Sequence, residues 1–257
     1  ATVLFAVQIY CDFSGYSVIA MGAAKMLGIS LMENFNAPYL STSVSEFWRR
    51  WHISLSTWFR DYLYIPLGGN RRGKVRKYVN LLITFGVSGL WHGANWTYVV
   101  WGLLNGTYQM IGEVLRPFRK KVAGFLEIKE DSLSHKGLRM VTTFLLVDLS
   151  WVFFRANTVF EGLRIVKRML TAKNHWVWFD GSLYECGLNN FRFMIWGILL
   201  LLVVDICKYK GIRLREIMAR QDYWAQCLCV ITAVLGILLF GMWGAGYDAA
   251  NFIYFQF

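Results

Sequence analysis

Two of the four histidines in this chain lie in segments suited to acid–base chemistry. His92 stands in residues 89–96, Gly-Leu-Trp-His-Gly-Ala-Asn-Trp, where small residues leave space and two tryptophans supply apolar walls. An imidazole with an unperturbed pKa of about 6.5 can be neutral at physiological pH, and burial favours the neutral form. A neutral imidazole can take a proton from an attacking hydroxyl, so His92 is a candidate general base. Asn95 is a candidate to orient this imidazole or to donate a hydrogen bond to an oxyanion.

A structural role is the alternative for His92, which would then be a buried histidine that only satisfies a break in a helix. Ionisable groups inside a membrane are costly, however, and for that reason they are functional candidates by default. The spacing around His92 leaves both possibilities open.

His52 lies in a second unusual segment, residues 47–61, Phe-Trp-Arg-Arg-Trp-His-Ile-Ser-Leu-Ser-Thr-Trp-Phe-Arg-Asp. This mixture of aromatic and cationic residues is also typical of a membrane-surface helix that binds lipid headgroups and does nothing more. The spacing from His52 to Asp61 does not match the compact His-x-x-x-x-Asp pattern of soluble glycerolipid acyltransferases, so no local dyad is predicted. The other histidines, His135 and His175, lie in polar segments and are expected to be solvated.

The composition of the chain indicates a membrane protein. Of its 257 residues, 56% are apolar and 17% are charged, whereas soluble domains are roughly 45–50% apolar and about 25% charged. Many of the 12 Trp and 13 Tyr stand beside charges, as expected for rings at the headgroup level. The net charge of +11 sits in short basic clusters between apolar runs, which favours the positive-inside bias of a membrane protein over nucleic-acid binding.

We therefore expect an all-α fold, a polytopic transmembrane helical bundle with broken or re-entrant helices and interfacial helices. Residues 79–114 should form two half-length or kinked helices that meet at residues 91–95 within the membrane, because basic clusters flank both ends of this stretch. The other expected spans are residues 3–26, 140–154, 191–207 and 224–243, and the expected interfacial helices are residues 43–60 and 158–170. The basic stretches expected in the cytoplasm are residues 71–77, 116–121 and 208–220, and the tail, 244–257, is expected on the other side.

One membrane domain is expected to cover residues 1–257. The chain begins inside an apolar segment, so we expect it to lack N-terminal spans. The five scattered cysteines do not form a disulfide framework, and Cys227 and Cys229 fit buried packing better than a metal or redox pair. We find no phosphate loop, dinucleotide fingerprint or zinc spacing, so no metal site is predicted.

Several blocks of the sequence resemble the membrane-bound O-acyltransferase family. The similarity is to its bacterial branch, which includes the alginate O-acetyltransferase membrane subunit and the D-alanyl transferase of teichoic acids. The blocks that carry it are residues 8–17, 33–40, 46–69 and 89–102, with the ending 252–257. One departure is Val18, where members usually carry an acid after Gly-Tyr-Ser.

The resemblance implies transfer of an acyl group, often acetyl, to a hydroxyl of a polysaccharide or lipid. The acceptor expected for this chain is an exported cell-surface polysaccharide. The family's presumed catalytic histidine corresponds to His92, and a second histidine, in the Trp-Arg-Arg-Trp-His block, corresponds to His52. His52 is either catalytic or lines the substrate channel. The side chains expected to contact substrate are Trp51, Trp91, Asn95, Arg60 and Asp61.

The resemblance also implies the partners and the location. The donor substrate would be acetyl-CoA or an acyl-carrier thioester from the cytoplasm, with no tightly bound cofactor. Further partners would be membrane lipid, a polysaccharide acceptor and an extracytoplasmic acyltransferase that completes the transfer, and nucleic acid is not expected. The protein would be a multi-pass protein of the bacterial plasma (inner) membrane.

Other functions fit some of the same features. A membrane channel or transporter for an acyl group or polymer would also use broken helices as a pathway. D-alanyl transfer to teichoic acid would use the same family chemistry, and a scaffold that only binds partners is a third possibility. The acceptor polymer and the donor are left open by the sequence.

Overall fold

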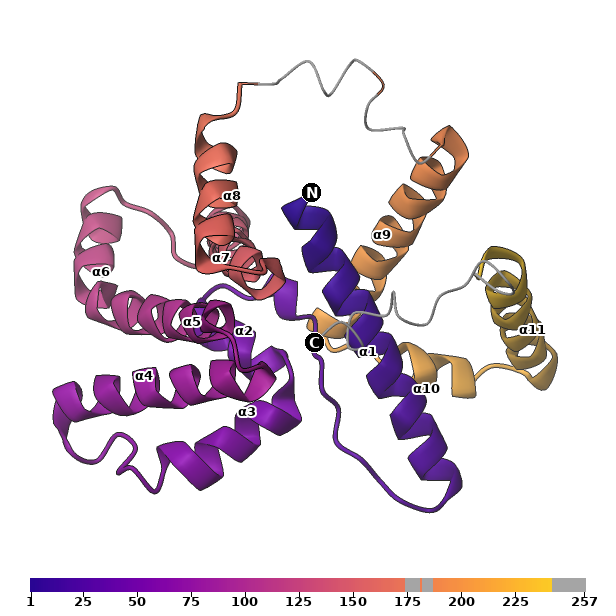
Figure 1. Cartoon of the computed structure of the whole chain (residues 1–257). Helices are drawn as coiled ribbons and strands as arrows, with labels where there is room; N and C mark the ends of the chain where they lie inside the picture. Colours follow the sequence, from indigo (N-terminus) through magenta and orange to yellow (C-terminus); the bar gives the residue numbers. More distant parts are fainter. Residues whose placement is uncertain (174–180, 182–186, 242–257) are drawn as a thin grey trace.

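The computed structural model describes residues 1–173, 181 and 187–241, and the regular elements in this part of the chain are all helical. The predicted all-α class is confirmed (Figure 1). The long helices are α1 (Thr2–Met26), α4 (Gly73–His92), α5 (Trp96–Val114), α7 (Leu133–Arg155), α9 (Leu188–Tyr209) and α11 (Tyr223–Phe240). The shorter elements are η1 (Pro38–Leu40), α2 (Val44–Arg50), α3 (Ile53–Phe59), η2 (Arg60–Tyr64), α6 (Arg116–Phe125), α8 (Val159–Thr171) and α10 (Leu214–Ala219).

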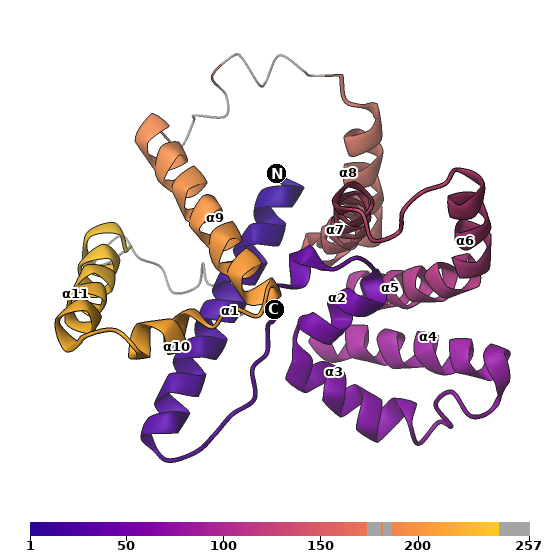
Figure 2. The same cartoon turned by 180° about the vertical axis from the view of Figure 1, so that it is seen from behind.

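Helix α1 lies at the centre, with α2 to α6 on one side and α9 to α11 on the other (Figures 1 and 2). Two hydrogen bonds from its polar side chains tie it to neighbouring helices. Tyr10 donates to Asp205 on α9, and Thr2 donates to Asp148 on α7, each over 2.8 Å. Thr2 and Tyr10 therefore join α1 to two of its neighbours, α7 and α9.

Aromatic rings from α1, α2, α5 and α7 form the core. Trp51 stacks on Phe47 with 5.5 Å between ring centroids, and Trp101 stacks on Trp151 at 5.7 Å. The two stacks meet where Trp51 contacts Trp151 at 5.1 Å. Aromatic pairs at such distances are each worth roughly 0.5–1.5 kcal/mol beyond the burial of their area. This cluster fixes the short helix α2 against the long helices that surround the site.

Helices α4 and α5 form a closely packed pair joined by residues 93–95. The break falls within the predicted meeting point, residues 91–95, but the prediction of half-length helices is wrong. Helix α4 has 20 residues and α5 has 19, so each is about 30 Å long. The difference arises because Lys74 and the bases after it belong to the first turns of α4, where a basic loop was expected.

Within the described residues, four helices are long and apolar enough to cross a membrane, and they match the four single spans expected from the sequence. They are Thr2–Met26, Leu133–Arg155, Asn190–Tyr209 and Tyr223–Phe240. Helix α7 begins seven residues before the predicted span, after a cap in which Ser132 accepts from the backbone of His135. Helices α4 and α5 are not among the four, so the predicted depth of their junction stays a prediction.

The expected interfacial segment at residues 43–60 is broken at Trp51 and His52 into α2 and α3. The amphipathic helix expected at residues 158–170 is present as α8, with Thr158 as its N-cap and Glu161 in its first turn. Helices α6 and α10 were not predicted. Cys186, His175 and the tail lie outside the described residues.

Candidate active site

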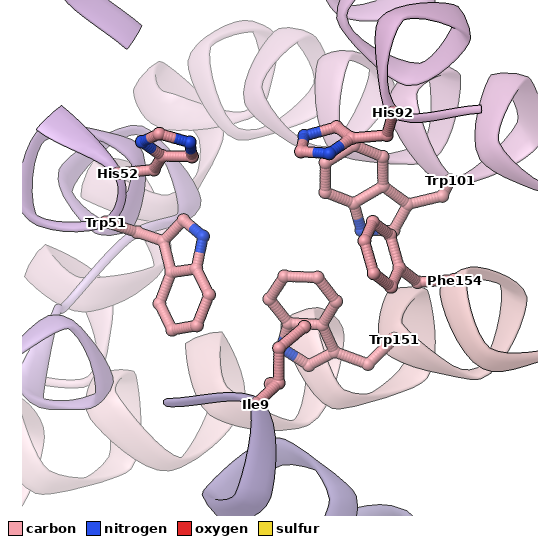
Figure 3. Close-up of a pocket in the computed structure, with 7 residues that line it drawn as sticks. All are labelled: Ile9, Trp51, His52, His92, Trp101, Trp151 and Phe154. Carbon is pink, nitrogen blue, oxygen red and sulfur yellow. The ribbon is translucent and has the colours of Figure 1, made fainter. Parts of the chain in front are cut away.

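The two candidate histidines face one small cavity inside the aromatic cluster (Figure 3). Its volume is about 10 Å³, which is room for about one water molecule. In Figure 3 the imidazoles of His52 and His92 stand across the cavity from each other. The residues that line it are Ile9, Trp51, His52, His92, Trp101, Trp151 and Phe154.

His52 is positioned by a left-handed backbone conformation between α2 and α3, with φ 44° and ψ 55°. This conformation costs roughly 1–2 kcal/mol for a residue with a Cβ, so neighbouring groups must hold it. Asn34 does so from outside the helix. Its side-chain oxygen accepts from the backbone and the hydroxyl of Ser54, at 3.1 and 2.6 Å, and its carbonyl accepts from Ile53 at 3.0 Å. Because Asn34 supplies the cap of α3, the His52 side chain is left to face the cavity.

The His52 imidazole has few stabilising contacts for a positive charge. Its Nδ1 is buried and has no hydrogen-bond partner within the described part of the chain. Its ring meets the Phe13 ring edge to face at 4.5 Å. Burial, and after it the nearby His92, lowers the pKa of His52 to about 3. His52 is therefore neutral at physiological pH.

His92 is positioned by the end of α4, of which it is the last residue. Its ring contacts Trp101 at 5.2 Å and Phe154 at 5.4 Å between centroids. The chain turns directly afterwards at Gly93, where an added methyl group would overlap the Tyr98 ring. Glycine at this position therefore lets α5 return close to α4 and holds His92 at the junction.

Asn95 has a different place from the one expected. Its side-chain oxygen caps α5 by accepting from the backbone of Thr97 at 3.1 Å, and its amide donates to the carbonyl of Asn157 at 3.1 Å. It does not line the histidine cavity. Its predicted contact with substrate stays a prediction.

Of the other side chains expected to contact the substrate, the structure places one at the cavity and the rest outside it. Trp51 lines the cavity, whereas Trp91 is 59% exposed and reaches the site only through its ring contact with His92 at 5.0 Å. Arg60 and Asp61 are exposed and pair with each other at 2.7 Å, and the hydrogen bond from Arg60 lowers the pKa of the Asp61 carboxyl. These two residues do not line the cavity.

Four lining residues were not predicted from the sequence, namely Ile9, Trp101, Trp151 and Phe154. They belong to ordinary apolar stretches of α1, α5 and α7. The spacing of Trp151 and Phe154 places both on one helix face, but core helices commonly show the same spacing. A sequence feature that could have indicated them is the concentration of large aromatic residues in apolar segments that also carry polar residues.

The arrangement can move a proton in a small space lined largely by buried aromatic rings. Two imidazoles face the same cavity, and one of them is neutral at physiological pH. A neutral imidazole can accept a proton from a hydroxyl that enters the cavity and can return it to a leaving group. Surrounding apolar rings strengthen electrostatic interactions inside the cavity.

Comparison with protein families gives a match to a family model described as MBOAT, membrane-bound O-acyltransferase family, over residues 1–127. The matched part contains both histidines and the helices that position them. It ends near the C-terminus of α6.

Several curated relatives are similar to a larger part of the chain. A probable alginate O-acetylase of Azotobacter vinelandii is 45% identical over 209 residues, 81% of this chain and 38% of that protein. A peptidoglycan O-acetyltransferase of Helicobacter pylori is 40% identical over 65% of this chain and 30% of its own length. A teichoic acid D-alanyltransferase of Streptococcus thermophilus is 34% identical over 59% of this chain and 39% of its own length. The chain thus spans less than two fifths of each of these relatives.

Proposed function

The chain belongs to the membrane-bound O-acyltransferase family, and on this premise we propose that it transfers an acetyl group to hydroxyls of an exported cell-surface polysaccharide. The single observation that carries the proposal is that His52 and His92, from separate helix breaks, face one water-sized cavity. Such a cavity is suited to one hydroxyl group and one proton transfer.

In the proposed reaction His92 is the general base. It accepts the proton of the acceptor hydroxyl while that oxygen attacks the carbonyl carbon of a thioester. The tetrahedral intermediate then collapses, the carbon–sulfur bond breaks, and the proton passes from His92 to the leaving sulfur. His52 faces the same cavity and either shares the proton transfer or shapes the path of the substrate.

The donor in this proposal is acetyl-CoA or an acyl-carrier thioester that arrives from the cytoplasm, and no tightly bound cofactor is needed. The exposed basic residues at the start of α4 and in the preceding turn would attract an anionic donor to that surface. The acceptor assignment is supported by the names of the acetyltransferase relatives, one for alginate and one for peptidoglycan. We further propose a bacterial plasma membrane location and an extracytoplasmic partner that completes the transfer.

The test is to replace each histidine in the full-length protein and to measure acetylation of the surface polymer. We expect His92→Gln to reduce O-acetyl content by at least about a hundredfold, the usual loss when a general base is removed. His52→Gln should reduce it by a smaller or equal factor. Protein amount in the membrane is measured for each variant by immunoblot.

His135→Gln is the matched control, because His135 lies in the first turn of α7, 16 residues before Trp151. It should leave acetylation unchanged. Retained acetylation in a well-expressed His92→Gln variant would rule out His92 as the base. Transfer of D-alanine rather than acetyl by the purified protein would keep the mechanism and change the donor, as the teichoic acid relative suggests.

A further inference from the structure

A buried hydrogen bond joins the helix that precedes His52 to one of the two helices that meet at the His92 break. Trp48 lies in α2, four residues before His52, and Asn105 lies in α5. The indole nitrogen of Trp48 donates to the side-chain oxygen of Asn105 over 3.1 Å, and both side chains are buried. Neither residue lines the histidine cavity, and the proposed reaction uses neither of them.

Asn105 uses both ends of its amide. Its oxygen accepts from Trp48, and its nitrogen donates to the backbone carbonyl of Trp101 over 2.9 Å. An indole N–H can only donate and a carbonyl can only accept, so one orientation of the amide satisfies both neighbours. Asn105 is 0% exposed, and a buried amide is costly unless it is hydrogen-bonded. Asn105 therefore holds the Trp48 indole at a defined place on α5.

On the α2 side, the position of Trp48 is passed on to His52. Helix α2 ends at Trp51, whose backbone N–H donates over 2.8 Å to the carbonyl of Phe47, the residue before Trp48. His52 follows directly in its left-handed conformation. One helical turn thus separates the indole that Asn105 holds from the imidazole at the cavity, so a shift of Trp48 would also move His52.

On the α5 side, the same amide is fixed to the residue against which His92 rests. Trp101 lies one turn before Asn105, is 1% exposed and lines the cavity. Its ring centroid lies 5.6 Å from that of Trp48 and 5.2 Å from that of His92. In Figure 3 the Trp101 ring stands beside His92 and across the cavity from Trp51. Asn105 thus contacts the supports of both histidines.

We propose that Asn105 is a positioning residue, which sets the separation of His52 and His92 across the cavity through Trp48 and Trp101. The proposal rests on the proposed function, because that reaction depends on where the two imidazoles stand. A displacement of about 1 Å between reacting groups can cost roughly a hundredfold in rate. A hydrogen bond outside the cavity can therefore control the rate of a reaction inside it.

The test combines polymer acetylation in cells with nuclear magnetic resonance of the full-length protein, labelled with ¹⁵N in its histidine rings and placed in nanodiscs without donor. Asn105→Leu removes both hydrogen bonds at similar side-chain volume. It should lower O-acetyl content by roughly tenfold at equal protein amount and shift the ring signals of His52 and His92.

Trp48→Phe removes the indole donor and leaves Asn105 in place, so it should shift the same two histidine signals and also lower O-acetyl content. The double variant should lose about as much acetylation as the more severe single variant, because both changes break one bond. If Asn105→Leu does not reach the membrane, the signals of Trp48→Phe decide: shifted signals support the proposal and unchanged signals overturn it.

Asn80→Leu is the matched control. Asn80 is also an asparagine with 0% exposure, and its amide donates to the carbonyls of Leu67 and Gly69, in the turn before α4. This variant loses buried hydrogen bonds as Asn105→Leu does, so its melting temperature should fall comparably. The signals of His52 and His92 should nevertheless stay as in the wild type.

Three outcomes overturn the proposal: unchanged histidine signals in Asn105→Leu, shifted signals with unchanged acetylation, or losses that add in the double variant. Equal shifts in Asn80→Leu would also overturn it, since they would come from destabilisation alone. The histidine signals are recorded without substrate, so they report on positioning even if His92→Gln keeps its acetylation. That result would reject the proposed function and leave the role of Asn105 in placing the two rings to be judged by the signals.

Discussion

At the scale of single residues, asparagine side chains cap the helices beside the two histidines, so the imidazoles are not used as helix caps. The α3 cap would ordinarily fall to His52 as the residue before the helix, but Asn34 and its carbonyl perform it from 18 positions earlier in the chain. At the other break Asn95 caps α5, three residues beyond His92. In both places an asparagine satisfies the backbone, so neither imidazole is needed there.

The low pKa of His52 predicts a dependence of stability on pH. Below pH 6.5 the unfolded chain takes up a proton on this histidine, whereas the folded protein does so only near pH 3. The free energy of unfolding should therefore fall with decreasing pH, by on the order of 2 kcal/mol at about pH 5. We expect wild type in nanodiscs to lose more of its apparent melting temperature between about pH 7.5 and about pH 5 than His52→Gln does. The control His135→Gln should follow the wild-type profile, and an unchanged profile for His52→Gln would contradict the assignment.

How much of the site could be predicted also depends on the residue. The two histidines and Trp51 stood out because their segments combined polar, aromatic and small residues in an apolar chain, and all three line one cavity. Arg60 and Asp61 were included from the same block, but their spacing places them on the exposed π-helical turn η2, where they pair with each other. Sequence spacing locates a segment, and the packing of the helices decides which of its faces is turned inward.

At the scale of elements, the α4–α5 pair depends on close contact between two backbones. A methyl group at Gly89 would overlap the carbonyl oxygen of Tyr98, and one at Gly102 would overlap that of Phe85. Small residues at helix contacts allow such an approach in membrane proteins. The position of His92 at the end of α4 is set by this contact.

We expect Gly102→Ala to separate the two helices and to destabilise the protein by about 1–3 kcal/mol, the usual cost of overpacking. Activity should fall with it, because His92 moves relative to the cavity. Gly112→Ala is the control on the same helix, since no heavy atom lies within 4 Å of the added methyl. It should be neutral or slightly stabilising. The measurement is the melting temperature of both variants in nanodiscs. Equal melting temperatures for the two variants would contradict this expectation, because they would mean that α4 and α5 accommodate the added methyl group without cost.

The elements were predicted better in kind than in length. The break between α4 and α5 was visible because glycines and Asn95 interrupt an apolar run. The length of α4 was not visible in the sequence, because the start of this stretch was placed after the last basic residue of the cluster at residues 71–77. Long basic side chains can extend to the headgroups from the first turns of a helix, so a helix can begin well before its apolar part.

At the scale of the whole molecule, the two ends of the α4–α5 pair differ in their polar contacts. Lys77, near the start of α4, and Glu113, near the end of α5, form an ion pair at 2.5 Å, and the Asn95–Asn157 hydrogen bond lies at the other end of the same two helices. The helices between them are about 30 Å long, close to the thickness of the hydrocarbon layer. The Asn95–Asn157 contact and the basic start of α4 thus lie at opposite ends of this helix pair.

This arrangement predicts sidedness. In a cysteine-free background, Arg72→Cys and Lys120→Cys should react with a membrane-impermeant maleimide only after cells are permeabilised, because basic loops stay in the cytoplasm. Asn157→Cys should react in intact cells. A permeant maleimide serves as the control that all three thiols are accessible. Labelling of all three from one side would contradict a bundle that crosses the membrane in this orientation.

The small size of the histidine cavity has a consequence for fidelity. Any acyltransferase with an activated thioester risks hydrolysis, in which a solvent molecule replaces the acceptor and the donor is consumed without product. A cavity of about 10 Å³ holds about one such molecule, so the acceptor hydroxyl and the hydrolytic competitor cannot be bound there together. An acceptor hydroxyl in the cavity would exclude the competitor by occupying its position. Under the proposed function, the ratio of transfer to hydrolysis should therefore rise with acceptor occupancy.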